Sequence, residues 1–244
     1  MPAFTGMTKI LALILPFLVL TSCGGAQPDR VDARDYDAFW LWAGVEPQPA
    51  LDRAKTIYIL AAEIKGAPEG RYVDLRPAVP RVAHARVWIV YRVETLDWDA
   101  RVIPRILRDL ESWQGNGNRV AGIQIDFDAA TRGLPGYASF LSQLRGQLPA
   151  DTGLSVTGLL DWSSGGDSPA LNALAGTVDE VVLQTYQGRR TIAGYQAYLR
   201  QLDRVRLPFR IGLVQHGEWH EPPGLSRNPA FRGYVVFLLN PEGS

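Results

Sequence analysis

Eight short apolar segments run through this chain between residues 38 and 238, and stretches that could each hold a helix separate most of them. Three of those stretches repeat apolar residues at helical spacing, over 102–110, 137–144 and 195–202. A regular alternation of strand and helix indicates a parallel sheet with helical crossovers. The eight expected strands cover residues 38–42, 56–62, 86–93, 122–127, 154–159, 180–185, 209–214 and 233–238.

Eight strand–helix units in one chain predict an α/β fold, a single compact (β/α)₈ TIM barrel over residues 36–244. The chain has 244 residues, near the lower limit of this fold, so several helices should be short or missing. An open doubly wound sheet is the main alternative. It is disfavoured because no Gly-x-Gly-x-x-Gly follows the first strand and the sequence contains no phosphate-binding loop.

The N-terminal segment is predicted to be a signal peptide over residues 1–22. One positively charged side chain, Lys9, precedes an apolar run that Pro16 interrupts. That run is too short to cross a bilayer, which needs about 20 apolar residues.

The end of this segment, Leu-Thr-Ser-Cys at residues 20–23, resembles the bacterial lipobox, in which the cysteine is acylated and becomes the mature N-terminus. The resemblance implies a lipid anchor at Cys23 and a short tether over 23–35. It also implies an exported envelope lipoprotein, in the outer membrane and facing the periplasm, since Gly24 follows the cysteine. The alternative is an ordinary secretory peptide with an incidental cysteine.

Composition excludes several classes of partner and chemistry. The 25 basic and 25 acidic residues balance and form no basic run, which argues against nucleic acid as a partner and against a polybasic membrane-binding surface. Cys23 is the only cysteine, so no disulfide can form within the chain. We predict no cofactor and no metal. The segment His216–His220 groups two imidazoles with Glu218, but its residue order and nearby prolines favour a solvated loop.

Two carboxylates share one face of the fourth expected strand. Strict alternation over 122–128 puts Gln124, Asp126 and Asp128 on one side and apolar residues on the other. Polar groups on the interior face of a strand cost free energy unless they are hydrogen-bonded or solvated, so this strand should open into a wet cleft. The alternative is that one Asp caps a following helix and the other only ends the strand.

Further carboxylates, amides and aromatic rings follow other expected strands. In a barrel enzyme the carboxyl ends of the strands carry the active site. Acids and flat aromatic faces gathered at one rim suit carbohydrate as substrate. The candidate substrate-binding residues at these strand ends are Glu63, Asp161, Trp162, Gln184, Tyr186, Glu218 and Trp219.

The fourth strand resembles the Asp-Gly-x-Asp-x-Asp-x-Glu motif of chitinase-like glycoside hydrolases, which use the substrate's N-acetyl group as nucleophile. The resemblance puts Asp128 on the general acid, Asp126 on the Asp that orients the acetamido group, and Gln124 on an outer Asp. Tyr186 falls on the Tyr that binds the acetamido oxygen, and Phe237 on a sugar-stacking Trp. The lipobox and compact barrel also resemble an uncharacterised proteobacterial lipoprotein family, catalogued as a domain of unknown function.

The chain departs from that motif at the acid. Asp in place of Glu shortens the acid by one methylene, and a misplacement of about 1 Å can cost ~10²-fold in rate. A conventional two-carboxylate mechanism is a second route, pairing Asp128 with Glu218, Asp161 or Glu63 across the barrel mouth.

Three function classes follow. The first is a glycoside hydrolase acting on an N-acetylated or related envelope polysaccharide. The second is a catalytically inactive barrel that binds glycan, and the third is a structural or assembly lipoprotein, since fold alone does not imply function. On the third expected strand, alternation turns Arg92 and Glu94 inward, and we interpret them as an ion pair inside the barrel.

Overall fold

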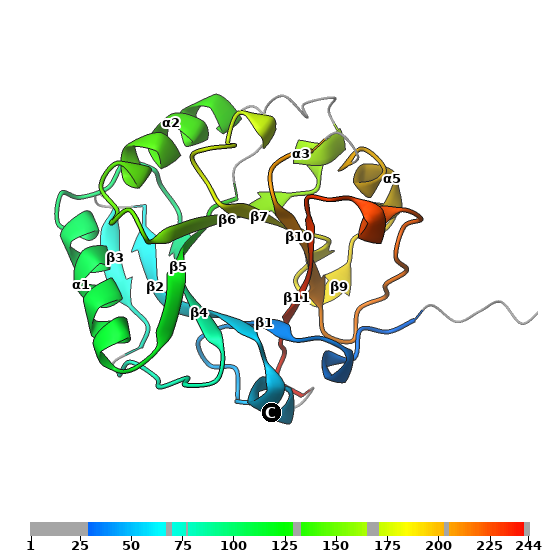
Figure 1. Cartoon of the computed structure of the whole chain (residues 1–244), viewed down its shortest axis with the longest axis horizontal. Coiled ribbons are helices and arrows are strands. Elements are labelled where there is room, and N and C mark those ends of the chain that lie inside the picture. Colours follow the sequence, from blue (N-terminus) through cyan, green and yellow to red (C-terminus); the bar gives the residue numbers. More distant parts are fainter. Residues whose placement is uncertain are drawn as a thin grey trace, which may run out of the picture.

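The computed structural model describes residues 29–66, 70–76, 78–128, 133–164, 171–202 and 205–241. Within these residues, eight parallel strands form a closed barrel with helices around its outside (Figure 1). Their order is β1-β11-β10-β7-β6-β5-β4-β2, and pairing of β1 with β2 closes the ring. The strands are β1 Ala38–Leu41, β2 Thr56–Lys65, β4 Arg86–Val93, β5 Arg119–Asp126, β6 Gly153–Leu159, β7 Glu180–Gln184, β10 Phe209–Val214 and β11 Phe231–Phe237.

The predicted (β/α)₈ barrel is therefore confirmed, and each expected strand overlaps an observed one. The largest shifts are of three residues. β5 begins at Arg119 rather than 122 because Arg119 and Val120 pair with the start of β4, and β2 continues to Lys65 rather than ending at 62. Short strands outside the barrel are β3 Arg71–Asp74, antiparallel to β2, and the hairpin β8 Tyr186–Gln187 with β9 Arg190–Thr191.

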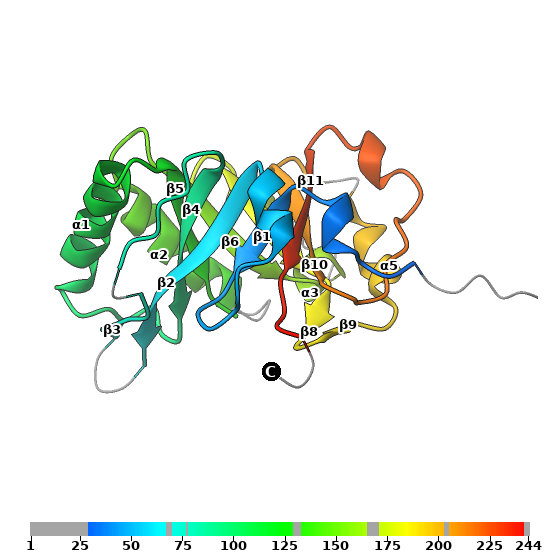
Figure 2. The ribbon, with the colours of Figure 1, turned by 90° about the horizontal axis from the view of Figure 1, so that it is seen from below.

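Helices of unequal length cover the barrel, as the short chain predicts (Figure 2). α1 packs its apolar stripe, which includes Ile106, Leu110 and Trp113, against the sheet. The four α-helices are α1 Val102–Gly115, α2 Leu134–Arg145, α3 Asp161–Ser164 and α5 Tyr195–Leu199 among the described residues, with 3₁₀ turns at Ala33–Asp35, Pro49–Arg53 and Leu225–Arg227.

Large aromatic side chains fill the barrel interior. Trp40, Tyr58 and Trp88 are buried there with smaller apolar residues. Two glycines make room for the indole rings. A Cβ at Gly212 would lie 2.6 Å from the Trp40 ring, and a Cβ at Gly153 would lie 2.6 Å from the Trp88 ring. The interior is thus a packed core, and any open space must lie at an end of the barrel.

The predicted signal peptide and Cys23 lie outside the described residues. The expected tether is described from residue 29 onward. There it packs on the loop after β10. The Val31 amide donates a hydrogen bond to the Gly217 carbonyl, and the His216 amide donates one to the Val31 carbonyl. Among the described helices, none is long and apolar enough to span a membrane.

Candidate functional site

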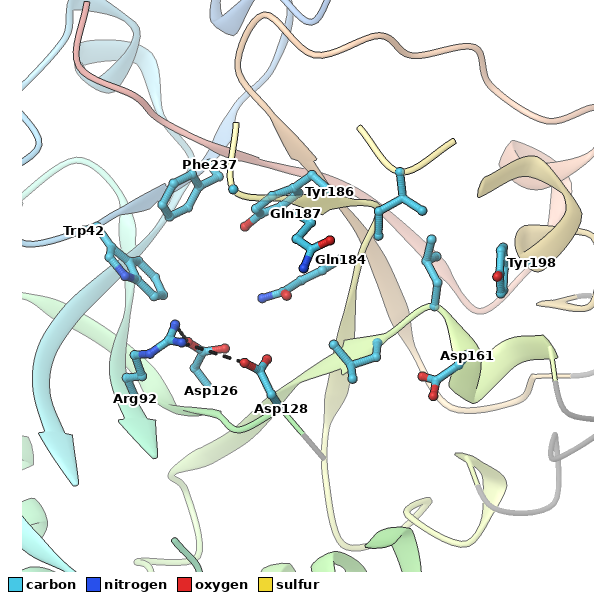
Figure 3. Close-up of a pocket in the computed structure, with 14 residues that line it drawn as sticks. Trp42, Arg92, Asp126, Asp128, Asp161, Gln184, Tyr186, Gln187, Tyr198 and Phe237 are labelled. Carbon is cyan, nitrogen blue, oxygen red and sulfur yellow. Dashed lines mark hydrogen bonds and ion pairs between the residues drawn. The ribbon is translucent and has the colours of Figure 1, made fainter. Parts of the chain in front are cut away.

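A cavity of about 700 Å³ opens at the carboxyl ends of the barrel strands (Figure 3). The final residues of β5, β6, β7 and β11 contribute Asp126, Leu159, Gln184 and Phe237 to its wall. This is the end at which barrel enzymes carry their active sites. Six of the residues that the sequence analysis assigned to a site line the cavity, namely Asp126, Asp128, Asp161, Gln184, Tyr186 and Phe237.

Asp126 is the buried carboxylate of the site, with 3% of the residue exposed. Its Oδ1 accepts a hydrogen bond from Thr157 Oγ1 at 2.8 Å, and its Oδ2 accepts one from Arg92 Nη1 at 3.3 Å. Burial raises the pKa of Asp126 to about 6, although the Arg92 charge and the Thr157 hydrogen bond oppose the rise. Asp126 therefore exchanges a proton close to neutral pH.

Asp128 is the exposed carboxylate, with 62% of its side chain accessible to solvent. Its Oδ2 lies 3.7 Å from Arg92 Nη2, so one guanidinium contacts both carboxylates (Figure 3). The β4–β5 register explains this arrangement, because Arg92 is the direct partner of Asp126. Asp128, two residues further along, then reaches the same cation from the rim.

Aromatic rings form the opposite wall. Tyr186 stacks on Phe237 with ring centroids 5.5 Å apart, and Trp42 meets Phe237 edge-on at 5.3 Å. Burial raises the pKa of Tyr186 well above its ordinary value, so its hydroxyl stays protonated. A flat apolar surface thus faces two carboxylates and a cation, which gives a sugar ring both a stacking face and hydrogen-bonding groups.

Three predicted binding residues are buried and do not line this cavity. Gln124 lies deeper in the barrel, where its amide accepts from Trp40 Nε1 at 2.6 Å and donates to Ser155 Oγ at 2.9 Å. Trp162 is fully buried beside Tyr137. Trp219 stacks on Tyr195 in the helix layer, with centroids 4.8 Å apart.

Two predicted carboxylates also lie outside the cavity. Glu63 forms an ion pair with Lys65 on β2, and Glu218 belongs to the loop that bridges to Arg30. Of the three carboxylates considered as partners for Asp128, the structure therefore brings Asp161 to the cavity. No three His, Cys, Asp or Glu side chains gather as a metal site within the described ranges.

Arg92 is the residue that the sequence interpretation misassigned. Its expected partner Glu94 instead accepts hydrogen bonds from Lys65 Nζ and from the Gly66 backbone, both at 3.0 Å. Arg92 pairs with the two aspartates. The alignment of the ends of β4 and β5 could have shown this, because neighbouring parallel strands bring their last inward residues together. Gln187 and Tyr198, which follow β7, also line the cavity and carried no sequence signal.

The family described as a domain of unknown function (DUF3142) matches residues 80–217, more than half of the chain. This chain belongs to that family. The matched segment runs from just before β4 to just after β10 and includes Arg92, Asp126, Asp128 and Tyr186. None of the curated proteins matches the chain in sequence.

Solved structures with a similar fold include the Bacillus cereus spore cortex-lytic enzyme SleL, at 20% identity and a TM-score of 0.51. That alignment covers 72% of this chain and 49% of SleL, so the chain spans about half the length of SleL. The chitinase domain of the Clostridium difficile spore coat protein CotE aligns at 14% identity and a TM-score of 0.49, covering 83% and 70% of the two chains. The Scadoxus multiflorus xylanase and α-amylase inhibitor XAIP-II aligns at 13% identity and a TM-score of 0.49, covering 82% of this chain and 92% of the inhibitor. At 20% identity, the SleL alignment shows a shared barrel fold.

Proposed function

We propose that the chain is a glycoside hydrolase acting on an N-acetylated or related polysaccharide of the cell envelope. The observation that carries the proposal is the meeting of Asp126, Asp128 and an aromatic wall in one cavity at the barrel mouth. A glycosidic bond needs a proton donor and a second group that stabilises positive charge on the sugar. The cavity supplies carboxylates for both roles.

The two aspartates differ in a way that suits different roles. Asp128 is exposed at the rim and can reach a glycosidic oxygen, so we assign it the role of acid. Asp126 is held by Thr157 and Arg92, which suits an orienting or charge-stabilising group. Because burial raises its pKa to about 6, Asp126 can also take up and release a proton during turnover.

A second candidate function is glycan binding without cleavage, and Arg92 favours it. Its guanidinium lies 3.3 Å from Asp126 and 3.7 Å from Asp128. An ion pair with a guanidinium favours the charged form of a carboxylate, and only the protonated form can act as a general acid. In this alternative, Trp42, Tyr186 and Phe237 hold the sugar and the aspartates accept hydrogen bonds from its hydroxyl groups.

We also propose an envelope location with an acyl anchor at Cys23, supported by the lipobox-like sequence before it. Labelling with a fatty-acid analogue, compared between the full chain and Cys23→Ala, tests this. Loss of label in the variant supports the anchor, and an unlabelled parent chain rejects it.

The function is tested by incubating the purified protein with chitooligosaccharides, peptidoglycan fragments and envelope polysaccharides. Reducing ends and bound fraction are both measured. Asp128→Asn and Asp126→Asn are compared with Glu63→Gln, which removes a carboxylate outside the cavity, on β2, two strands away from β5. A hydrolase loses turnover in both Asp variants and keeps it in the control.

Binding without reducing ends in the parent protein supports the inactive glycan-binding barrel instead. Neither cleavage nor binding on the whole panel rejects both proposals and leaves the structural or assembly role.

A further inference from the structure

The aromatic wall of the cavity is assembled from three separate segments of the chain. Trp42 follows β1, Tyr186 begins the hairpin of β8 and β9, and Phe237 ends β11. Tyr186 stacks on Phe237, and Trp42 meets Phe237 edge-on (Figure 3). Such a wall binds a flat sugar face best when its segments are already held in place, because ordering them during binding costs free energy.

Trp42 begins a tight turn in the loop after β1. The Val45 amide donates a hydrogen bond to the Trp42 carbonyl at 3.2 Å, and Gly44 has a φ of 81°, in the left-handed region that favours glycine. Ala43, Gly44 and Glu46 are exposed. Hydrogen bonds must therefore supply much of the support for this turn.

Asn240 supplies such bonds from the segment that follows β11. Its Nδ2 donates to the Gly44 carbonyl at 2.8 Å, and its Oδ1 accepts from the Glu46 amide at 2.8 Å. The Asn240 carbonyl also accepts a hydrogen bond from Arg189 Nη2 at 3.2 Å, and Arg189 lies in the turn that joins β8 to β9. Asn240 thus ties together the three segments that carry the aromatic wall.

We propose that Asn240 is a positioning residue for glycan binding, which holds Trp42 against the stacked Tyr186 and Phe237 rings. Asn240 does not line the cavity as the described residues define it, so it acts on a glycan through the aromatic wall. This inference rests on the proposed function, because it concerns glycan binding in the same cavity.

The loss of this support should have a partial effect. Arg76 Nη2 also donates to the Trp42 carbonyl, at 3.4 Å, so the start of the turn keeps a second support. Asn240→Ala should therefore weaken binding of the N-acetylglucosamine hexamer by about threefold to tenfold, the effect of one or two neutral hydrogen bonds. The maximal rate of any cleavage should stay within about twofold of the parent, because Asp126 and Asp128 keep their contacts.

Titration calorimetry of the purified full chain with the N-acetylglucosamine hexamer tests the inference, and Asn228→Ala is the matched control. The Asn228 amide also joins two backbone groups, since it donates to the Leu202 carbonyl at 2.9 Å and accepts from the Ala230 amide at 2.8 Å. Asn228 precedes β11, at the opposite end of the barrel. Both variants should lose similar stability in urea denaturation, but only Asn240→Ala should lose affinity.

A double-mutant cycle with Trp42→Ala separates positioning from a general loss of structure. Without the Trp42 ring, Asn240→Ala should change the affinity by less than about 1.5-fold, because two residues that act through one contact are not additive. Asn240→Asp keeps the acceptor and loses the donor, so its affinity should lie between those of the parent and Asn240→Ala.

Three results would overturn the inference while glycan binding stands. They are parent-like affinity in Asn240→Ala, an equal loss of affinity in Asn228→Ala, and a full loss that persists in the Trp42→Ala background. If the parent neither binds nor cleaves the hexamer, the proposed function itself fails for this polymer class, and the inference fails with it.

Discussion

Carboxylates meet a guanidinium at both ends of the barrel, but with different surroundings. At the base, Glu180 of β7 accepts hydrogen bonds from the Tyr58 hydroxyl and from Arg210 Nε, the latter at 3.1 Å, and 10% of its side chain is exposed. At the mouth, Arg92 contacts Asp126 and Asp128 beside an open cavity. The same chemical groups thus serve packing at one end and are available to a ligand at the other.

This difference shows that pairing alone does not separate a structural ion pair from a functional one. Access does. At the base, both partners are largely buried, with 21% of the Arg210 side chain and 10% of the Glu180 side chain exposed, so this pair is costly to break. At the mouth, Asp126 is buried, but Arg92 and Asp128 are 44% and 62% exposed and can contact a ligand.

The largest effect should come from breaking the base pair. Glu180→Ala leaves Arg210 and the Tyr58 hydroxyl without their buried partner, and we expect the free energy of unfolding to fall by about 3–5 kcal/mol. Asp128→Ala should cost less than about 1 kcal/mol, because that carboxylate is mostly exposed. Urea denaturation of both variants measures the contrast, and equal losses would refute the distinction between the two ends.

The next effect concerns the pH dependence of stability at the mouth. The folded-state pKa of Asp126, about 6, lies above its ordinary value of 3.8, so the folded protein holds this proton more tightly than the unfolded chain. The resulting stabilisation is fully present below pH 3.8 and is lost as the pH rises through 6. The expected loss is about 3 kcal/mol.

Asp126→Asn removes this titration. Unfolding curves from pH 4 to 7 should show the parent losing about 2.5 kcal/mol relative to the variant, because a small part of the full effect is already lost at pH 4. Parallel curves for the two proteins would mean that Asp126 is not desolvated as the structure shows.

The strands were predictable because alternation and apolar runs follow directly from which side of a strand faces the core. The cavity was predictable in part. Asp126 and Gln184 are the last residues of β5 and β7, so once the strands are known, these side chains must lie at the carboxyl end of the barrel. Trp219 and Glu218 were not predictable. The chain turns back after β10, where the Gly217 amide bonds the Val214 carbonyl, and this turn carries both residues away from the mouth.

Tyr186→Phe should weaken binding of an N-acetylated glycan by at most tenfold. The change removes one hydroxyl from the cavity and keeps the ring that stacks on Phe237. Tyr137→Phe is the matched control. The Tyr137 hydroxyl is buried in the helix layer and has no hydrogen-bond partner among the described residues. The control should keep the affinity of the parent, and calorimetric titration compares the two variants. A loss of affinity in Tyr137→Phe alone would contradict the proposed position of the binding site.

The smallest effect on binding should come from Trp219→Phe. Trp219 stacks on Tyr195 and meets Tyr234 edge-on, so the smaller ring loses packing contacts in the helix layer, and we expect about 1–2 kcal/mol less stability. Glycan affinity should stay within twofold of the parent, because the indole does not line the cavity. Trp42→Phe makes the same substitution in the cavity wall, beside Phe237, and should weaken binding severalfold. Denaturation and titration of both variants therefore separate an aromatic ring needed for stability from one proposed to bind glycan. The reverse result, with weaker binding only in Trp219→Phe, would move the proposed binding site to the loop after β10.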